Sequence, residues 1–114
     1  MSQLISILGL GESGAGAALL AHKQGFEVYA SDAKSVREDY AVMLRGKGIQ
    51  FEENGHDLER ILRSDLAGKS PGIPNNAKII VEAQRAGIPV ISEIEFASRY
   101  TNGKLIAIPG TNGK

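Results

Sequence analysis

The sequence predicts an α/β fold in which helices cover both faces of an open parallel sheet. Short apolar runs alternate with helix-like segments along the 114 residues, and this alternation is typical of parallel strands joined by crossover helices. The first apolar run, residues 4–8, is nearly continuous, as a strand that is buried on both faces requires. A glycine-rich turn at residues 9–14 follows it directly, as in doubly wound nucleotide-binding folds.

Three strands and three helices are expected in the first half of the chain. The first helix is rich in alanine and leucine and ends at Gly25. Ser35 is expected to cap the second helix, and Asp57 to cap a short third one. The expected strands are residues 4–8, 27–30 and 49–51, and the expected helices are residues 15–24, 35–47 and 57–62.

The second half continues the alternation, with one weak strand. Ala67 and Gly68 offer little side chain to pack, but the rigid turn Ser70-Pro71-Gly72-Ile73-Pro74 follows them and favours a strand before it. Ser92 is expected to cap the last helix, with Glu95 completing a capping box. The expected strands are residues 66–69, 89–91 and 105–108, and the expected helices are residues 76–86 and 92–100.

Residues 101–103 read as a linker, so we expect one domain at residues 1–102 and the start of a second at 103–114. The second segment runs from an apolar strand into Gly110-Thr111-Asn112-Gly113-Lys114, the form of a shortened phosphate-binding loop. The Ser or Thr that normally follows and holds Mg²⁺ is missing. We therefore interpret the chain as the N-terminal piece of a larger nucleotide-using enzyme.

Composition excludes several classes of protein. Thirteen basic and thirteen acidic side chains cancel, so no net field favours nucleic acid or anionic lipid. No apolar run is long enough to span a membrane and no export signal is recognisable, so a cytoplasmic location is expected. The chain has no cysteine, which excludes disulfides. Its histidines, His22 and His56, are far apart in sequence, and no metal site is expected.

The turn Gly9-Leu10-Gly11-Glu12-Ser13-Gly14 is a Gly-x-Gly-x-x-Gly motif between a strand and a helix. Its glycines let the backbone approach a diphosphate, and the helix N-terminus supplies N–H donors, as in Rossmann-like folds. Asp32 ends the next strand, where an acidic group meets a ribose or a base. The alternative is a tight turn that binds nothing. Ser13 either donates to a phosphate or caps the helix. Glu12 would repel a diphosphate unless its side chain turns outward, and its charge suits the helix N-terminus.

Other residues admit a functional or an ordinary interpretation. Gly72 would let a ligand lie against the backbone at the sheet edge, or belongs to an ordinary rigid turn. Glu93 and Glu95 are expected to have capping and surface roles. His56 is interpreted as a loop residue, and Lys34 as an exposed lysine unless it touches a base or phosphate. Four arginines are expected on solvated helix faces: Arg37, Arg45, Arg60 and Arg63.

Taken in this order, the motifs resemble the Mur ligases of bacterial cell-wall synthesis, and among them the branch that adds D-glutamate. Asn112 and the Ser-Pro-Gly-Ile-Pro turn favour that branch over the ligases that add L-alanine. The segments that carry the resemblance are residues 9–14, 31–32, 69–74, 88–96 and 110–114.

The resemblance implies a three-domain parent enzyme active in peptidoglycan synthesis. Its first domain would grip the UDP of UDP-N-acetylmuramoyl-L-alanine, its second would bind ATP and Mg²⁺, and its third would bind D-glutamate. The substrate carboxylate would be phosphorylated, and the D-glutamate amine would attack the acyl phosphate. The parent is expected to be a monomer. The chain alone is expected to be inactive, with no tightly bound cofactor.

The resemblance also implies roles for single residues. The loop Gly11, Glu12, Ser13 and Gly14 would hold the diphosphate through backbone N–H groups. Asp32 would bind uracil with Ala33 and Lys34 beside it, Gly72 would line the substrate channel, and residues 110–114 would belong to the ATP phosphate site. The chain departs from the family pattern at Ala33, at Ala67-Gly68 and at Pro109.

Two alternatives to this function remain open from the sequence. The glycine motif with Asp32 fits an NAD-binding domain of an oxidoreductase or regulatory protein equally well, and a bare structural fragment would bind no nucleotide. Residues 105–108 would lack sheet neighbours in a chain of this length, so we expect them to contact a neighbouring molecule.

Overall fold

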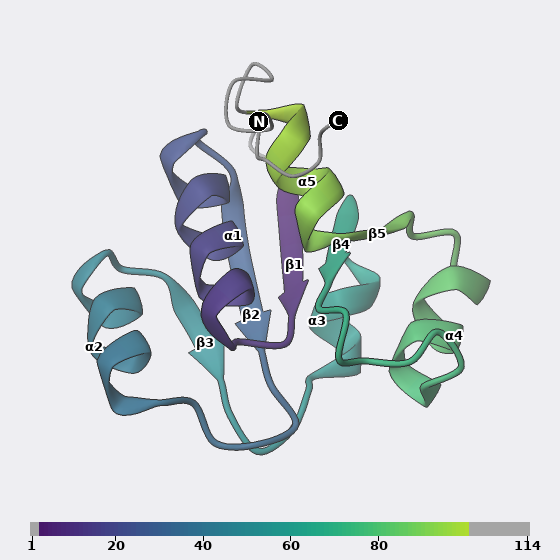
Figure 1. Cartoon of the computed structure of the whole chain (residues 1–114). Helices are drawn as coiled ribbons and strands as arrows, with labels where there is room; N and C mark the ends of the chain where they lie inside the picture. The colour runs from purple at the N-terminus through teal and green to yellow at the C-terminus, as the bar shows by residue number, and fades with distance from the viewer. Residues whose placement is uncertain (1–2, 101–114) are drawn as a thin grey trace, which may run out of the picture.

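The structure, a computed structural model, describes residues 3–100 and confirms the predicted α/β architecture (Figure 1). Five parallel strands form one sheet in the order β3-β2-β1-β4-β5. The chain moves outward from β1 to β3 and then returns to the other side of β1, so the strand order reverses between β1 and β4. The strands are β1 (Leu4–Leu8), β2 (Glu27–Ser31), β3 (Gln50–Glu52), β4 (Leu66–Lys69) and β5 (Val90–Ser92).

Helices cover both faces of this sheet, as predicted (Figure 1). On one face, Phe96 and Leu44 pack with residues of β1 such as Ile7. On the other face, Ile61 and Ile80 pack against β2 and β4. The first face carries α1 (Glu12–Lys23), α2 (Glu38–Gly46) and α5 (Glu93–Arg99), and the second carries α3 (Leu58–Leu62) and α4 (Lys78–Arg85).

The weak fourth strand is present, and its glycine has a packing reason. Gly68 pairs with Ile7 in the β1–β4 register. A β-carbon added at Gly68 would lie 3.3 Å from Cδ1 of Ile7, and the Ile7 side chain is fully buried. The small residue therefore leaves room for a large neighbour in the centre of the sheet.

Helix starts differ most from the prediction. α1 begins at Glu12 rather than Ala15, because Gly11 is its N-cap and the helix takes in the end of the glycine turn. α2 begins at Glu38, and Ser35 is not its cap. The N–H of Val36 donates to Glu53 Oε1 over 2.7 Å, so it is held outside the helix.

Smaller differences affect the remaining elements. The helix predicted at 76–86 spans Lys78–Arg85, β3 and β5 each begin one residue later than predicted, and β2 continues to Ser31. Asp57 caps α3 as predicted, and Ser92 caps α5 by accepting from the N–H of Glu95. The reciprocal half of the capping box is not formed, because the Glu95 carboxylate bonds to Arg99 instead.

The expected linker, the strand at 105–108, the phosphate-binding loop at 110–114 and the domain boundary after residue 102 lie outside the described residues. Within residues 3–100, no helix combines the length and apolar character that crossing a membrane needs.

Candidate functional site

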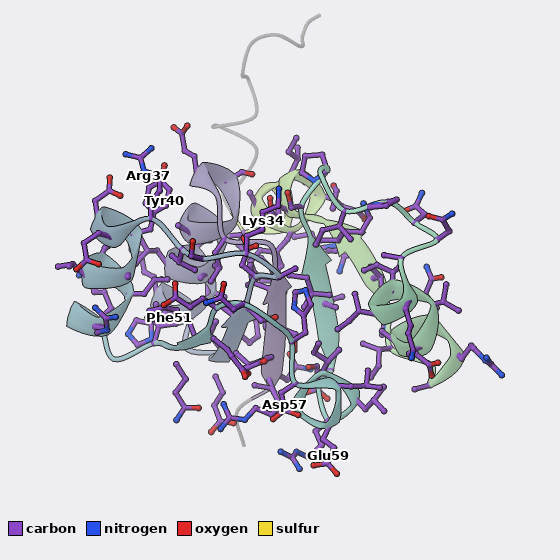
Figure 2. The ribbon with its side chains drawn as sticks, turned by 90° about the horizontal axis from the view of Figure 1, so that it is seen from below. Lys34, Arg37, Tyr40, Phe51, Asp57 and Glu59 are labelled. Carbon is purple, nitrogen blue, oxygen red and sulfur yellow. The ribbon has the colours of Figure 1, made fainter. Side chains whose placement is uncertain are left out.

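A cavity of about 770 Å³ opens at the edge where the parallel strands end, the edge that Figure 2 views. It lies where the strand order reverses, which is the place where open α/β sheets bind ligands. Three turns that are far apart in sequence meet there. The lining residues are Gly9, Gly11, Asp32, Ala33, Lys34, His56, Leu58, Ser70, Gly72, Ile73, Pro74, Ala77, Lys78, Ile79 and Glu82.

The glycine turn presents free backbone donors at this edge. Gly9 has a φ of 98°, and its N–H donates to the carbonyl of Ser31 over 2.7 Å. Gly11 caps α1 without any side-chain hydrogen bond. Within residues 3–100, the backbone N–H groups of residues 11–14 have no acceptor. Such donors at a helix N-terminus attract an anion.

Gly14 closes the turn by tight packing. A β-carbon there would overlap the carbonyl oxygen of Gly9 and would lie 2.7 Å from Oε2 of Glu93. Gly9 is also confined, since a β-carbon on it would lie 2.6 Å from Cβ of Ser70. The turn therefore needs both glycines, and it lies directly against the turn that follows β4.

Asp32 joins the glycine turn to the end of β2. Its Oδ2 accepts from the N–H of Leu10 over 2.7 Å, and its Oδ1 accepts from the N–H of Lys34 over 2.8 Å. Each oxygen retains a lone pair for one further donor. The carboxylate therefore holds the glycine turn and the segment after β2 in place on two sides of the cavity. Ala33 and Lys34 line the cavity beside it.

Lys69 shapes the third wall. Its Nζ donates to the carbonyl of Ile73 over 2.6 Å and to that of Ser70 over 3.3 Å. The N–H of Gly72 donates to Oγ of Ser70 over 3.2 Å. These bonds close the turn, and with Pro74 they leave a largely apolar wall facing the glycine turn.

His56 lies in the loop between β3 and α3, as predicted, but its side chain has a structural role there. Its Nδ1 lies 2.5 Å from Oγ of the buried Ser31, and it lines the cavity. The bridge between Asp32 and Gly55 brings it there. Burial lowers the pKa of His56, while the charges of Asp32 and Glu52 oppose that shift. The Asn-Gly turn before it, with Asn54 at a φ of 62°, was the only sequence signal.

Ser13 does not cap the helix, which was one of its two predicted roles. Its Oγ donates to Oε1 of Glu93 over 2.6 Å, and α1 has no side-chain cap. The surface role expected for Glu93 is wrong as well, because that side chain is 2% exposed. Glu95 is exposed as predicted, and it pairs with Arg99.

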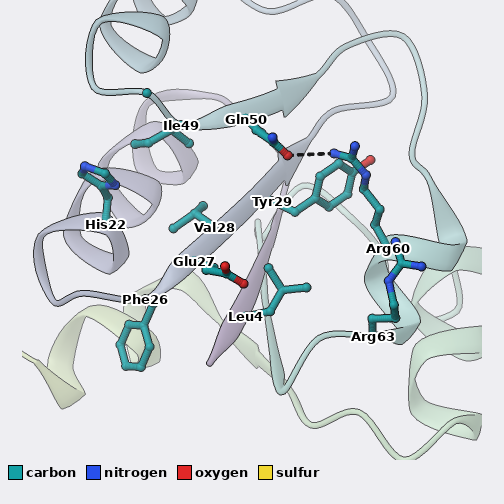
Figure 3. A pocket seen from close by; sticks show the side chains of 11 residues that line it. Leu4, His22, Phe26, Glu27, Val28, Tyr29, Ile49, Gln50, Arg60 and Arg63 are labelled. Atoms are coloured by element: carbon teal, nitrogen blue, oxygen red, sulfur yellow. Dashed lines mark hydrogen bonds between the residues drawn. The ribbon is translucent and has the colours of Figure 1, made fainter. Parts of the chain in front are cut away.

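A second cavity of about 510 Å³ lies at the opposite edge, where the strands begin (Figure 3). Arg60 there is not simply solvated: it donates to Oε1 of Gln50 over 3.1 Å and lies over the ring of Tyr29. The guanidinium of Arg37 likewise lies over the ring of Tyr40 (Figure 2).

Within residues 3–100, no cluster of three acidic, histidine or cysteine side chains offers a metal site.

Known proteins with similar sequence are ligases. A UDP-N-acetylmuramoylalanine--D-glutamate ligase from Bacteroides fragilis is 52% identical over 110 residues, which are 96% of this chain and 25% of that protein. The chain thus spans about a quarter of the length of this relative.

Similar solved structures include a murein peptide ligase from Psychrobacter arcticus, with a TM-score of 0.77 and 26% identity over 86% of this chain and 20% of that one. An imine reductase from Pseudomonas sp. has a TM-score of 0.54 and 17% identity, covering 90% of this chain and 38% of that one. At this identity the second likeness shows the fold alone.

The family model described as the MurD N-terminal domain matches residues 4–79, which include the glycine turn, Asp32 and the turn after β4. With a relative that is 52% identical over almost the whole chain, this match shows that the chain belongs to the MurD N-terminal domain family.

Proposed function

We propose that the chain binds the UDP part of UDP-N-acetylmuramoyl-L-alanine, as the first domain of an ATP-dependent ligase that adds D-glutamate in peptidoglycan synthesis. The name of the relative from Bacteroides fragilis supports the substrate. The proposal includes a cytoplasmic, monomeric parent enzyme. The chain by itself is proposed to be inactive, because it spans a quarter of that relative.

The observation that carries the proposal is the meeting of three turns around one cavity. Backbone N–H groups of Gly11, Glu12, Ser13 and Gly14 would hold the diphosphate, with Ser13 acting through its main chain because its hydroxyl is bonded to Glu93. Asp32, with Ala33 and Lys34, would lie beside uracil, and Gly72 would line the path of the sugar.

ATP and Mg²⁺ belong to a different part of the proposed enzyme. Residues 110–114 would join its ATP phosphate site, which supplies the phosphoryl group for carboxylate activation. The proposed domain boundary after residue 102 separates this segment from the UDP site.

The relatives, rather than Asp32, favour UDP over the NAD alternative: the ligase from Bacteroides fragilis is 52% identical over 96% of the chain, whereas the imine reductase is 17% identical. An NAD site uses the acidic residue at this position to accept from the ribose hydroxyl groups. Here each carboxylate oxygen of Asp32 already accepts one backbone N–H. Each oxygen keeps one lone pair, which suffices either for the N–H of uracil or for the ribose hydroxyl groups, so Asp32 alone does not separate the two ligands.

Calorimetric titration of the chain with UDP, uridine and NAD tests the proposal. We expect heat from UDP, weaker binding of uridine because it lacks the diphosphate, and none from NAD. Asp32→Ala should weaken UDP binding by about tenfold, since two charge-assisted bonds that order the walls are lost. Asp39→Ala, which removes an exposed carboxylate paired with Arg37, is the matched control. Binding of NAD without UDP would refute the proposal.

A further inference from the structure

Glu93 is a buried acid with one oxygen that the fold leaves unexplained. It is the first residue of α5 and is 2% exposed. Its Oε1 accepts from Ser13, but its Oε2 is buried and has no hydrogen-bond partner within residues 3–100. Burying an ionised carboxylate oxygen without a donor is costly, so the oxygen needs either a donor or a proton.

The unexplained oxygen lies against the glycine turn. The site of a β-carbon on Gly14 is 2.7 Å from Oε2 of Glu93 and overlaps the carbonyl oxygen of Gly9. The two oxygens are therefore neighbours on the same side of Gly14. No described N–H or hydroxyl group donates to the Gly9 carbonyl. Without a hydrogen between them, Oε2 of Glu93 and the carbonyl oxygen of Gly9 repel each other. A proton on Oε2 would let it donate an O–H···O hydrogen bond to that carbonyl.

We propose that Glu93 is a positioning residue for the glycine turn, and that it acts as a protonated acid bridging the two ends of that turn. Its Oε1 accepts from Oγ of Ser13 at the end of the turn. Its Oε2–H donates to the carbonyl of Gly9 at the beginning. The bridge fixes the first turn of α1 against α5, and so fixes the direction of the free N–H groups that hold the diphosphate.

The surrounding charges are compatible with a protonated Glu93. Burial raises the pKa of Glu93, and the Ser13 bond and the charge of Lys69 oppose that shift. Lys69 faces it from β4 but is bonded to backbone carbonyls, and Glu93 forms no ion pair within residues 3–100. Glu12 on α1 and Glu95 on α5 are exposed. A bound diphosphate would add negative charge nearby and favour the protonated acid further.

The protonation state can be measured without any ligand. In the ¹³C spectrum of the 114-residue chain, the side-chain carboxyl resonance of Glu93 is assigned by its loss in Glu93→Gln. We expect it to remain in the protonated position as pH rises above 4.5, the ordinary pKa of a glutamic acid. Titration of Glu93 at its ordinary pKa of 4.5 would overturn the proposal.

Binding of UDP tests the positioning role, and this second arm rests on the proposed function. Glu93→Gln should keep UDP affinity within about threefold, because an amide offers the same acceptor and an N–H donor in place of the O–H. Glu93→Ala should weaken UDP binding about tenfold. Uridine binding should change in neither variant, and Glu95→Gln is the matched control on the same helix.

The two arms separate the possible failures. A wild-type chain that ignores UDP refutes the proposed function, while the ligand-free titration still decides the state of Glu93. A Glu93→Gln variant as weak as Glu93→Ala shows that the charge is needed and overturns the bridge. If Glu93→Ala does not fold, Ser13→Ala takes its place, because it removes the bond from Ser13 to Oε1 of Glu93. Ser13→Ala should bind UDP more weakly than Glu93→Gln. Equal UDP binding by these two variants would also overturn the bridge.

Discussion

Gly14 and Gly16 lie on the same helix, but only Gly14 has no room for a side chain. A β-carbon at Gly14 would overlap the backbone of Gly9, which cannot rotate away as a side chain can. We expect Gly14→Ala to push the first turn of α1 off the glycine turn and to destabilise the fold by about 1–3 kcal/mol. UDP binding should fall about tenfold or more, as measured by calorimetry alongside urea unfolding.

Gly16→Ala is the control for that variant. Nothing lies within 4 Å of a β-carbon at Gly16, so alanine should stabilise the helix by about 0.5–1 kcal/mol and leave UDP binding unchanged. If Gly14→Ala binds UDP like the wild type, the packing of the turn does not determine anion binding.

Ser13 and Asp32 show how far single roles could be predicted. The glycine spacing located the turn, and Asp32, which was singled out at the end of the second strand, lines the same cavity. The partner of Ser13 is Glu93, 80 residues away, and nothing in either local sequence points to the other. Asp32 was expected to face a ligand, but its two oxygens also hold the backbone of Leu10 and Lys34.

At the scale of elements, Ile7 and Gly68 form a large–small pair between neighbouring strands. We expect Gly68→Ala to destabilise the fold by about 1–3 kcal/mol, because a β-carbon would lie 3.3 Å from Cδ1 of Ile7. Ile7→Val should cost about 0.5–1.5 kcal/mol. The double variant should cost less than the sum, since removing Cδ1 makes room for the new methyl group. Additive free energies in urea unfolding would contradict this pairing.

Strands were predicted better than helix starts, for a physical reason. A continuous apolar run such as residues 4–8 reports burial on both faces of the sheet, which depends on the run itself. A helix start depends on which backbone groups find partners elsewhere. Val36 bonds to Glu53, which held it outside the helix that Ser35 was expected to begin.

At the scale of the whole molecule, the half-buried His56 and the buried Glu93 act in opposite directions on stability as pH changes. The pKa of His56 is lowered from 6.5, so its contribution is complete above 6.5 and is lost as pH falls through the folded value. The pKa of Glu93 is raised from 4.5, so its contribution is complete below 4.5 and is lost as pH rises through the folded value. Glu93→Gln should therefore gain stability over the wild type as pH rises above 4.5.

Urea unfolding at several pH values measures this difference. His56→Gln should have the complementary effect, with less loss of stability than the wild type on acidification through pH 6.5. Glu95→Gln makes the same chemical change at an exposed position of the same helix and is the control for the substitution itself. A constant difference between Glu93→Gln and the wild type at every pH would contradict the raised pKa of Glu93.

The sequence by itself determined the α/β class, the strand positions and the turns at the binding edge, because apolar periodicity and turn-forming residues act over a few neighbouring positions. Only the tertiary structure decided which of these turns share a cavity, that His56 joins them, and that Glu93 rather than a ligand holds Ser13. Those contacts follow from the strand order β3-β2-β1-β4-β5, which places segments from opposite ends of the chain side by side.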